Sequence, residues 1–214
     1  VVGNALPKLY AQRSEAQAAT INIQQTQTQG DSLKPLLIAI TMLTAMFMGC
    51  SFNAMSIIGE KEDGIATINV VLPITKGQYI MQKMLLGFIG GALSTLFTAL
   101  VCMRVPITQS IVVLALVVFS AFIAALAGLF IGELSSGLMV GIIYIKVVMI
   151  LFIAPPILVY LAAPTNSVIH WISYLFPSSA TFYGLMDMQG GRMEHMGLYI
   201  LVLLAHCIVW FIVY

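Results

Sequence analysis

The chain has 214 residues, of which 60% are hydrophobic and 8% are charged, and its mean hydropathy is +1.02. That composition lies far outside the range of soluble domains and predicts an integral membrane protein. A net charge of +1, without a run of Lys or Arg, excludes nucleic acid as a partner.

Residues 1–33 differ from the rest, because the stretch AQAATINIQQTQTQGDS is rich in Gln, Ala and Thr. It holds few large apolar groups, so we expect an aqueous segment. Pro35 suits the first turn of a helix, where a missing backbone N–H costs nothing. The first membrane span is therefore predicted to begin near this proline.

A membrane-spanning helix needs roughly 20 apolar residues, and five stretches are long enough. The predicted spans are residues 35–58, 79–103, 106–131, 137–162 and 196–214. The fold class that these spans indicate is an all-α membrane protein, a polytopic helical bundle. Glycine pairs four residues apart, such as Gly87 with Gly91 and Gly128 with Gly132, favour close packing inside that bundle.

Charge gathers between the first two spans, although the chain has only 9 basic and 8 acidic residues. Four charged residues follow one another at 60–63, and Lys76 and Lys83 come shortly after. Loops rich in Lys and Arg stay in the cytoplasm, so this loop is predicted to be cytoplasmic. Thr75 is predicted to cap the span after the loop.

A short amphipathic helix is predicted inside the charged loop. After Gly64, the side chains of Ile65, Ile68 and Leu72 fall at helical spacing and form one apolar stripe, which Pro73 ends. An interfacial helix with solvated charges explains this pattern, and so does an element that docks on a partner.

Glu133 and Lys146 are the ionisable residues nearest the interior of the predicted spans. Such residues are candidates for function, because a charge inside a membrane is costly. We expect a structural contact between the two across the turn at 132–136, and a direct role in transport is the alternative.

Residues 168–186 are apolar but broken by Pro177 and the polar residues after it. They are predicted to form two short interfacial or re-entrant helices rather than a span. Trp171, Tyr174 and Tyr183 suit the level of the lipid headgroups. The two serines after the proline are expected to be accessible from outside.

The charged loop resembles that of the ABC-2 family, the type-2 ABC transporter permeases. In that family the second span runs into a Glu-rich, Gly-containing cytoplasmic segment, a short coupling helix, a proline and a Lys near the third span. The corresponding positions here are Glu60, Glu62, Gly64, the helix 65–72, Pro73 and Lys83. The stretch HWISYLFPSSATFYGLMD is similar to the family's segment of short extracellular helices before the last span.

The resemblance covers residues 34–214 and implies how the chain is organised. Residues 34–214 correspond to the transmembrane domain, with a cytoplasmic coupling loop at 59–78 and an extracellular re-entrant segment at 164–195. Such permeases have six spans, so a first span and most of an extracellular domain are expected to precede Val1. Residues 1–33 are then the end of that extracellular segment.

The resemblance also implies which residues meet the ATPase. The expected ATPase-coupling residues are Glu60, Glu62, Asp63, Gly64, Ile65, Ile68, Leu72, Pro73 and Lys83. Glu60 and Glu62 are expected to hold the geometry of the loop or to meet basic groups of the partner. The apolar stripe is expected to fill a groove on the ATPase.

The function expected is that of a permease subunit of an ATP-driven exporter in the inner or plasma membrane. The sequence lacks a GxxxxGK[ST] phosphate loop, so ATP and Mg²⁺ are expected on two partner ATPase subunits. A second permease chain, identical or homologous, completes the expected unit. The apolar spans favour an amphipathic cargo such as a drug, a peptide antibiotic or a lipid. A carrier, channel or assembly scaffold without an ATPase is the alternative.

No catalytic residue and no metal site are predicted. His170, His195 and His206 lack metal-ligand spacing, and the three cysteines form no CxxC pair. We therefore interpret these residues as structural.

Overall fold

The computed structural model describes residues 33–65, 75–103, 107–162 and 167–213. Residues Ile38–Tyr214 form one compact unit, and residues Val1–Leu37 form another. Of the N-terminal unit, only Leu33–Leu37 are described, and they are the first residues of a helix. The larger unit contains all the other described residues.

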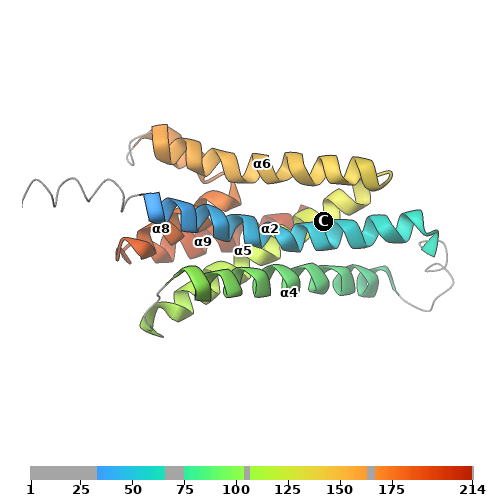
Figure 1. Ribbon diagram of the computed structural model, residues 1–214, viewed down its shortest axis with the longest axis horizontal. Coiled ribbons are helices and arrows are strands. Elements are labelled where there is room, and N and C mark those ends of the chain that lie inside the picture. The colour runs from blue at the N-terminus through green and yellow to red at the C-terminus, as the bar shows by residue number, and fades with distance from the viewer. Residues whose placement is uncertain (1–32, 66–74, 104–106, 163–166, 214) are drawn as a thin grey trace, which may run out of the picture. The chain divides into compact units, whose positions relative to one another are not determined.

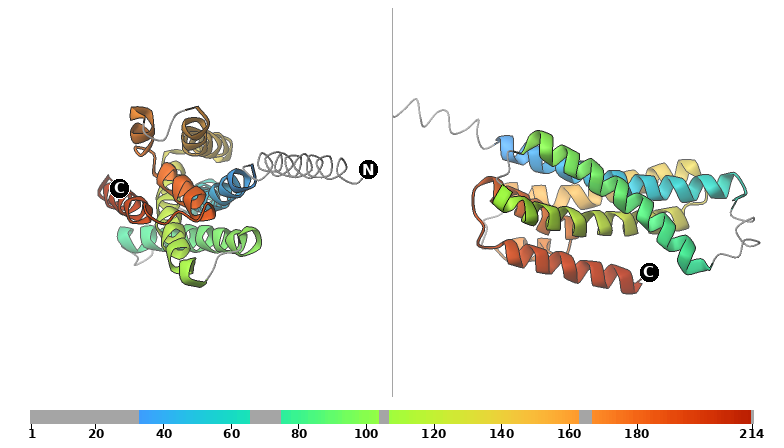
Figure 2. Two further views of the ribbon diagram at one scale, coloured as in Figure 1. Left: turned by 90° about the vertical axis from the view of Figure 1, so that its left-hand side faces the viewer. Right: turned by 90° about the horizontal axis from the view of Figure 1, so that it is seen from below.

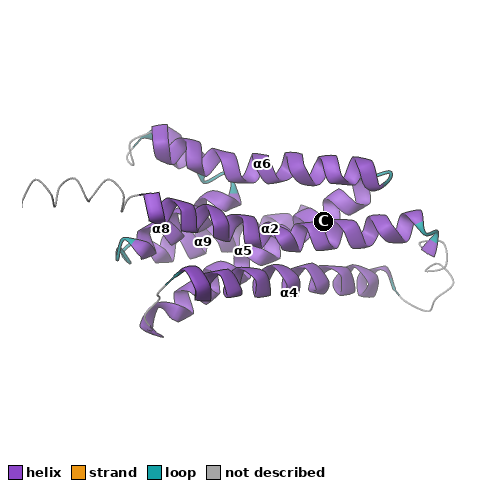
Figure 3. Cartoon of the chain, viewed as in Figure 1, coloured by secondary structure: helices purple, strands orange, loops and turns teal. Residues whose placement is uncertain are grey.

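Helices make up nearly all of the described chain, joined by short turns (Figures 1 and 3). They are α2 (Leu33–Glu62), α4 (Lys76–Cys102), α5 (Ile107–Leu134), α6 (Leu138–Ala162), α7 (Val168–Ser173), α8 (Pro177–Gln189) and α9 (Met196–Val213). Among the described residues, five of these helices are long and apolar enough to cross a membrane: α2, α4, α5, α6 and α9. The predicted all-α membrane fold and its five spans are confirmed.

Helix α5 is the centre of the bundle. It packs against α4, α6, α8 and α9, and seen end-on it lies between α4 and α6 (Figure 2). In its most hydropathic stretch 61% of the residues are buried, against 11% in α6. Because α6 is so little covered by the chain, most of its surface is left for lipid or for another molecule.

Helices α2, α4 and α5 approach closely because glycines face one another. A Cβ atom on Gly91 would lie 3.1 Å from the Cα of Gly49, and one on Gly128 would meet the carbonyl of Cys50. Beside these glycines, the buried Asn53 donates its amide N–H to the carbonyl of Ala125 at 2.8 Å. The predicted use of the glycine pairs for packing within one bundle is confirmed.

The predicted start of the charged loop is wrong. Glu60, Lys61 and Glu62 form the last turn of α2, so the helix runs four residues beyond the predicted end at 58. The helix ends where Gly64 takes a positive φ of 71°, a conformation that glycine adopts without strain. At the other end of the loop, residues 76–78 already belong to α4.

The predicted break at Pro177 is confirmed, because α7 ends at Ser173 and α8 begins at this proline. Of the two alternatives for α8, interfacial or re-entrant, burial favours the re-entrant one, and the expected access to the serines is wrong: Ser178, Ser179 and Tyr183 are all buried. Helix α8 packs among α5, α6 and α9, which a run of small and aromatic side chains allows. Trp171 on α7 is exposed, and its position at the level of the lipid headgroups stays a prediction.

Helices α4, α5 and α6 run in alternating directions through the bundle (Figure 1). The end of α2 and the start of α4 therefore lie at one end, while α7 and the start of α9 lie at the other (Figures 1 and 2). The charged loop and residues 168–186 are thus at opposite ends, as predicted. Which end faces the cytoplasm stays a prediction.

Candidate functional site

Three consecutive residues at the end of α2 each bond a different helix. Glu60 bonds α4, Lys61 bonds the end of α5, and Glu62 bonds the start of α6. We call these three residues, together with Lys83, the charged junction. Side chains at successive positions on a helix point about 100° apart, so one turn reaches three neighbours.

Glu60 lies between two side chains of α4. Its Oε2 accepts a hydrogen bond of 2.7 Å from the hydroxyl of Tyr79, and its Oε1 pairs with the ammonium of Lys83. Lys83 also donates to the hydroxyl of Ser56 on α2 at 2.6 Å. The exposed fractions of the Lys83 and Glu60 side chains are 13% and 24%. This partly shielded ion pair joins α2 to α4 through charge-assisted hydrogen bonds.

Lys61 caps the end of α5. Its Nζ lies 2.8 Å from the carbonyl oxygen of Gly132, 2.6 Å from that of Glu133 and 3.3 Å from that of Ser135. The last carbonyls of a helix lack partners within it and carry partial negative charge. An ammonium at this place satisfies them and joins α2 to α5.

Glu62 caps the start of α6. Its Oε1 accepts a hydrogen bond of 2.7 Å from the backbone N–H of Leu138, the first residue of that helix. The first N–H groups of a helix are unpaired and favour an anion. Lys61 and Glu62 thus bind the two sides of the α5–α6 turn, each with a charge opposite to the partial charge of the helix end that it binds.

The junction is continuous with the expected coupling segment. After Glu62 the N–H of Asp63 bonds the carbonyl of Gly59 at 2.9 Å, and Gly64 ends the helix. Asp63 and Ile65 are exposed. The remaining expected coupling residues, Ile68, Leu72 and Pro73, lie outside the described residues.

The start of α4 has the predicted cap. Thr75 accepts from the N–H of Gln78 at 3.3 Å, and the Gln78 side chain accepts from the N–H of Thr75 at 3.1 Å. This reciprocal pair is a capping box. The described residues on either side of 66–74 therefore belong to well-defined helix termini.

Glu133 and Lys146 are not brought together. Both side chains are exposed, and no ion pair joins them in the part of the chain that the structure describes. The turn that was expected to bring them into contact is bound instead by Lys61 and Glu62. Lys146 therefore remains a charge in a span, at a cost of about 3 kcal/mol if it lay at the centre of the bilayer.

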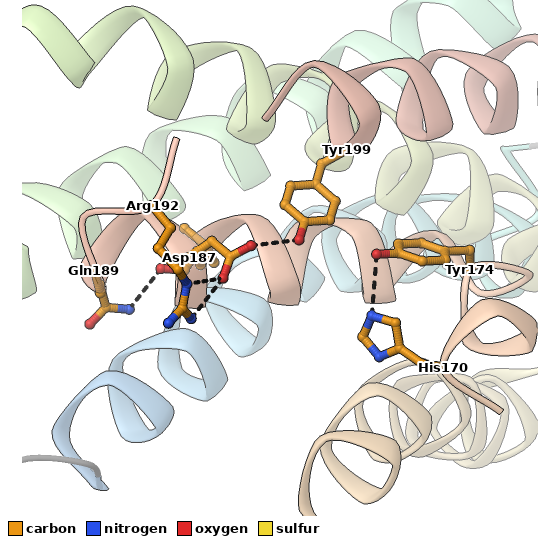
Figure 4. Close-up of polar contacts among 7 residues, drawn as sticks. His170, Tyr174, Asp187, Gln189, Arg192 and Tyr199 are labelled. Carbon is orange, nitrogen blue, oxygen red and sulfur yellow. Dashed lines mark hydrogen bonds and ion pairs between the residues drawn. The ribbon is translucent and has the colours of Figure 1, made fainter. Parts of the chain in front are cut away.

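The opposite end of the bundle holds a second polar cluster, centred on Asp187 of α8 (Figure 4). Its carboxylate accepts from the Tyr199 hydroxyl at 2.6 Å and from the guanidinium of Arg192 at 2.8 and 3.0 Å. The hydrogen bonds to Asp187 raise the pKa of Arg192. We call Asp187, Arg192 and Tyr199 the Asp187 network. It fixes the turn between α8 and α9.

An aromatic stack lies beside this network. The rings of His170 and Tyr183 are 4.4 Å apart between centroids, and the Tyr174 hydroxyl lies 3.4 Å from Nε2 of His170 (Figure 4). Burial lowers the pKa of His170, and the Asp187 carboxylate partly offsets that. Burial raises the pKa of Tyr174 and of Tyr183. The neutral forms of all three side chains are therefore favoured.

Sequence reasoning missed Lys61, Tyr79 and Ser56 as members of the site. Lys61 stands in the charged run, but its partners are backbone carbonyls 71–74 residues away, which no side-chain pattern reveals. Tyr79 and Ser56 carry a detectable signal: they lie four residues from Lys83 and from Glu60, the spacing of neighbours on a helix.

Comparison with known families gives one match, which covers residues 2–214 and is described as an ABC-2 family transporter protein. The match includes nearly all of residues 1–33, whereas the resemblance described from sequence motifs covered only residues 34–214. No curated protein and no solved structure matches the chain. Membrane subunits of this family work with ABC ATPases. The chain therefore belongs to the ABC-2 family and is a multi-pass permease subunit of an ABC transporter.

Proposed function

We propose that this permease subunit belongs to an ATP-driven exporter and that the charged junction passes movement from the ATPase to the spans. The observation that carries the proposal is that one turn of α2 bonds α4, α5 and α6 at the same end of the bundle. The same turn leads directly into the segment 65–72, which is expected to dock on the ATPase.

The contacts of the junction suit a mechanical role. Charge-assisted hydrogen bonds are short and directional, so a shift of the α2 end displaces its partners rather than slipping past them. Lys61 and Glu62 bind backbone groups, not flexible side chains, on both sides of the α5–α6 turn. A movement of the docked segment would therefore reach four helices together.

The complete transporter is proposed to contain two ABC ATPase subunits and two permease chains, identical or homologous. ATP and Mg²⁺ bind to the ATPases, and two nucleotide sites need two ATPases. Membership of the ABC-2 family supports this arrangement over a carrier or channel without an ATPase. The apolar composition of the spans supports an amphipathic cargo, and the inner or plasma membrane is the proposed location.

A charge swap tests the junction. Glu60→Lys places two cations together, and the double variant Glu60→Lys with Lys83→Glu restores an opposite pair at the same place. In liposomes that hold the permease with its ATPase, we expect the single variant to lose about tenfold in ATP-dependent expulsion of an amphipathic dye, a change of about 1.4 kcal/mol. The double variant should recover most of the loss.

Glu194→Lys is the matched control, because Glu194 is exposed and lies in the connection before α9. It should leave dye expulsion and ATPase copurification unchanged. If Glu60→Lys pumps like the parent, the junction is not a coupling element. A double variant as inactive as Glu60→Lys would show that the identity of the residues, and not their pairing, matters.

A further inference from the structure

Helix α6 exposes side chains along most of its length. Seven of them lie toward one side of the helix and are exposed among the described residues: Met139, Ile143, Lys146, Val147, Ile150, Leu158 and Leu161. We call this surface the α6 stripe. Six of its seven members are apolar, and Lys146 is the only charged residue of the helix.

Lys146 lies well inside the span. It is the ninth residue of α6, so its Cα is about 12 Å along the helix axis from Leu138. Helical side chains point back toward the N-terminus, and the long Lys side chain carries its ammonium in that direction. The charge therefore comes to rest near the boundary of the leaflet at the α6 start.

No acid of the described chain pairs with Lys146. Two acids lie near the start of α6. Glu62 accepts from the N–H of Leu138, and Glu133 forms no ion pair with Lys146. Water reaches an ammonium at the leaflet boundary, and an anion from outside the described chain would pair with it as well. An apolar residue at 146 would suit a surface that meets only acyl chains, so the charge favours an anionic neighbour.

A second copy of this chain offers one exposed acid near this level, Glu133 at the end of α5. The acidic residues of the described spans lie at span ends: Glu60 and Glu62 at the end of α2, and Glu133 at the end of α5. Glu60 and Glu62 are already bonded within the junction. Helices α4, α6 and α9 have no acidic residue. Glu133 of a second copy is therefore the competing partner for Lys146, and the crosslinking outcome below tests it. The apolar side chains around Lys146 favour a lipid, because acyl chains cover them while the headgroup supplies the anion.

We propose that the α6 stripe binds a membrane lipid with an anionic headgroup in the leaflet at the α6 start. Lys146 bonds the headgroup phosphate, and the aliphatic side chains of the stripe lie along the acyl chains. In a zwitterionic lipid, the cation of the headgroup repels Lys146 and so offsets part of the attraction to the phosphate. The site thus selects lipids by net charge. This inference concerns binding only and is independent of the direction of transport.

The experiment measures lipid selectivity directly. The protein is placed in phosphatidylcholine nanodiscs with spin-labelled phosphatidylglycerol or spin-labelled phosphatidylcholine of the same acyl chains. The immobilised fraction of each lipid gives their relative association. We expect Lys146→Met to lower the preference for phosphatidylglycerol about fivefold, the effect of one cation near a membrane surface. Lys146→Arg should keep the preference, because the charge remains.

Leu93→Met is the matched control, since it introduces the same residue at an exposed apolar position of α4, outside the α6 stripe, without changing charge. It should bind both lipids like the parent. An unchanged preference in Lys146→Met overturns the proposal. So does a second outcome, in which Lys146→Cys forms an oxidative crosslink between two chains, because the stripe is then an interface between copies. Neither readout uses ATP, so failure of the exporter proposal leaves this test intact.

Discussion

The two ends of the bundle stabilise their helices in different ways. The charged junction joins residues that are 19–76 positions apart, whereas the Asp187 network joins residues 5 and 12 positions apart. At the junction, one turn of α2 connects three other spans. At the opposite end, the polar bonds shape only the segment from α8 to the start of α9. A substitution in the junction should therefore destabilise several spans, and a substitution in the Asp187 network should destabilise only the segment from α8 to the start of α9.

Exposure sharpens this contrast. The Lys83 side chain at the junction is 13% exposed, while Arg192 in the Asp187 network is 68% exposed. Exposed ion pairs are screened by water and contribute little to folding. The junction is therefore the end where loss of one charge should cost most.

Lys83→Met should have the largest effect on stability. It removes the ion pair to Glu60 and the bond to Ser56, and it leaves a partly shielded carboxylate with the Tyr79 hydroxyl. We expect a loss of about 2 kcal/mol, typical of a hydrogen bond to a charged group. Thermal unfolding in detergent measures it. Lys34→Met, at an exposed lysine, is the control and should unfold like the parent.

Thr75→Ala should have the next largest effect. It removes the side-chain oxygen that accepts from Gln78, and with it half of the capping box. Loss of such a cap costs about 1 kcal/mol. Hydrogen exchange should rise in the first turn of α4 and stay unchanged in α8. Thr75→Ser keeps the hydroxyl and should behave like the parent; equal exchange in both variants would show that the cap does not hold this end.

Most of the fold was predictable from local patterns, because spans and caps depend on residues close in sequence. The lengths of the apolar stretches predicted the five spans, and Pro177 predicted the start of a helix. Thr75 was predicted to cap α4, and it does so together with Gln78. The end of α2 was not predictable in the same way. Its charged residues look like a loop until partners 71–76 positions away satisfy them inside a helix.

The candidate site shows the same limit. Glu60 and Lys83 were both expected in the site, Glu60 in the loop and Lys83 in the span after it. Each was expected to help contact an ATPase, and their ion pair with each other was not predicted. The expected contact between Glu133 and Lys146 fails because Lys61 and Glu62 already bind the turn between them. Sequence order places charges near a turn, whereas three-dimensional packing decides which of them reach it.

Asp187→Asn should have a smaller effect than Lys83→Met or Thr75→Ala. The amide oxygen can still accept from Tyr199, but the ion pair with the exposed Arg192 is lost. We expect about 0.5 kcal/mol, the range for exposed ion pairs. Combined with Lys83→Met, its cost should add, because the two sites share no partner. A coupling energy well above about 0.5 kcal/mol would contradict independent ends.

The smallest expected effect is the pH dependence contributed by His170. Burial against Tyr183 lowers its pKa in the folded protein, and the Asp187 carboxylate offsets only part of this. The unfolded chain has an ordinary His pKa of about 6.5, so below that pH the unfolded state binds more protons than the folded state. Stability is therefore full above about pH 6.5 and falls as the pH decreases toward the folded pKa. In His170→Gln, the temperature of the unfolding midpoint should change less between about pH 7 and pH 5 than it does in the parent. His195→Gln, at an exposed histidine, is the control and should keep the parent's change of midpoint with pH. A slope that survives His170→Gln but disappears in His195→Gln would place the titrating group outside the aromatic stack.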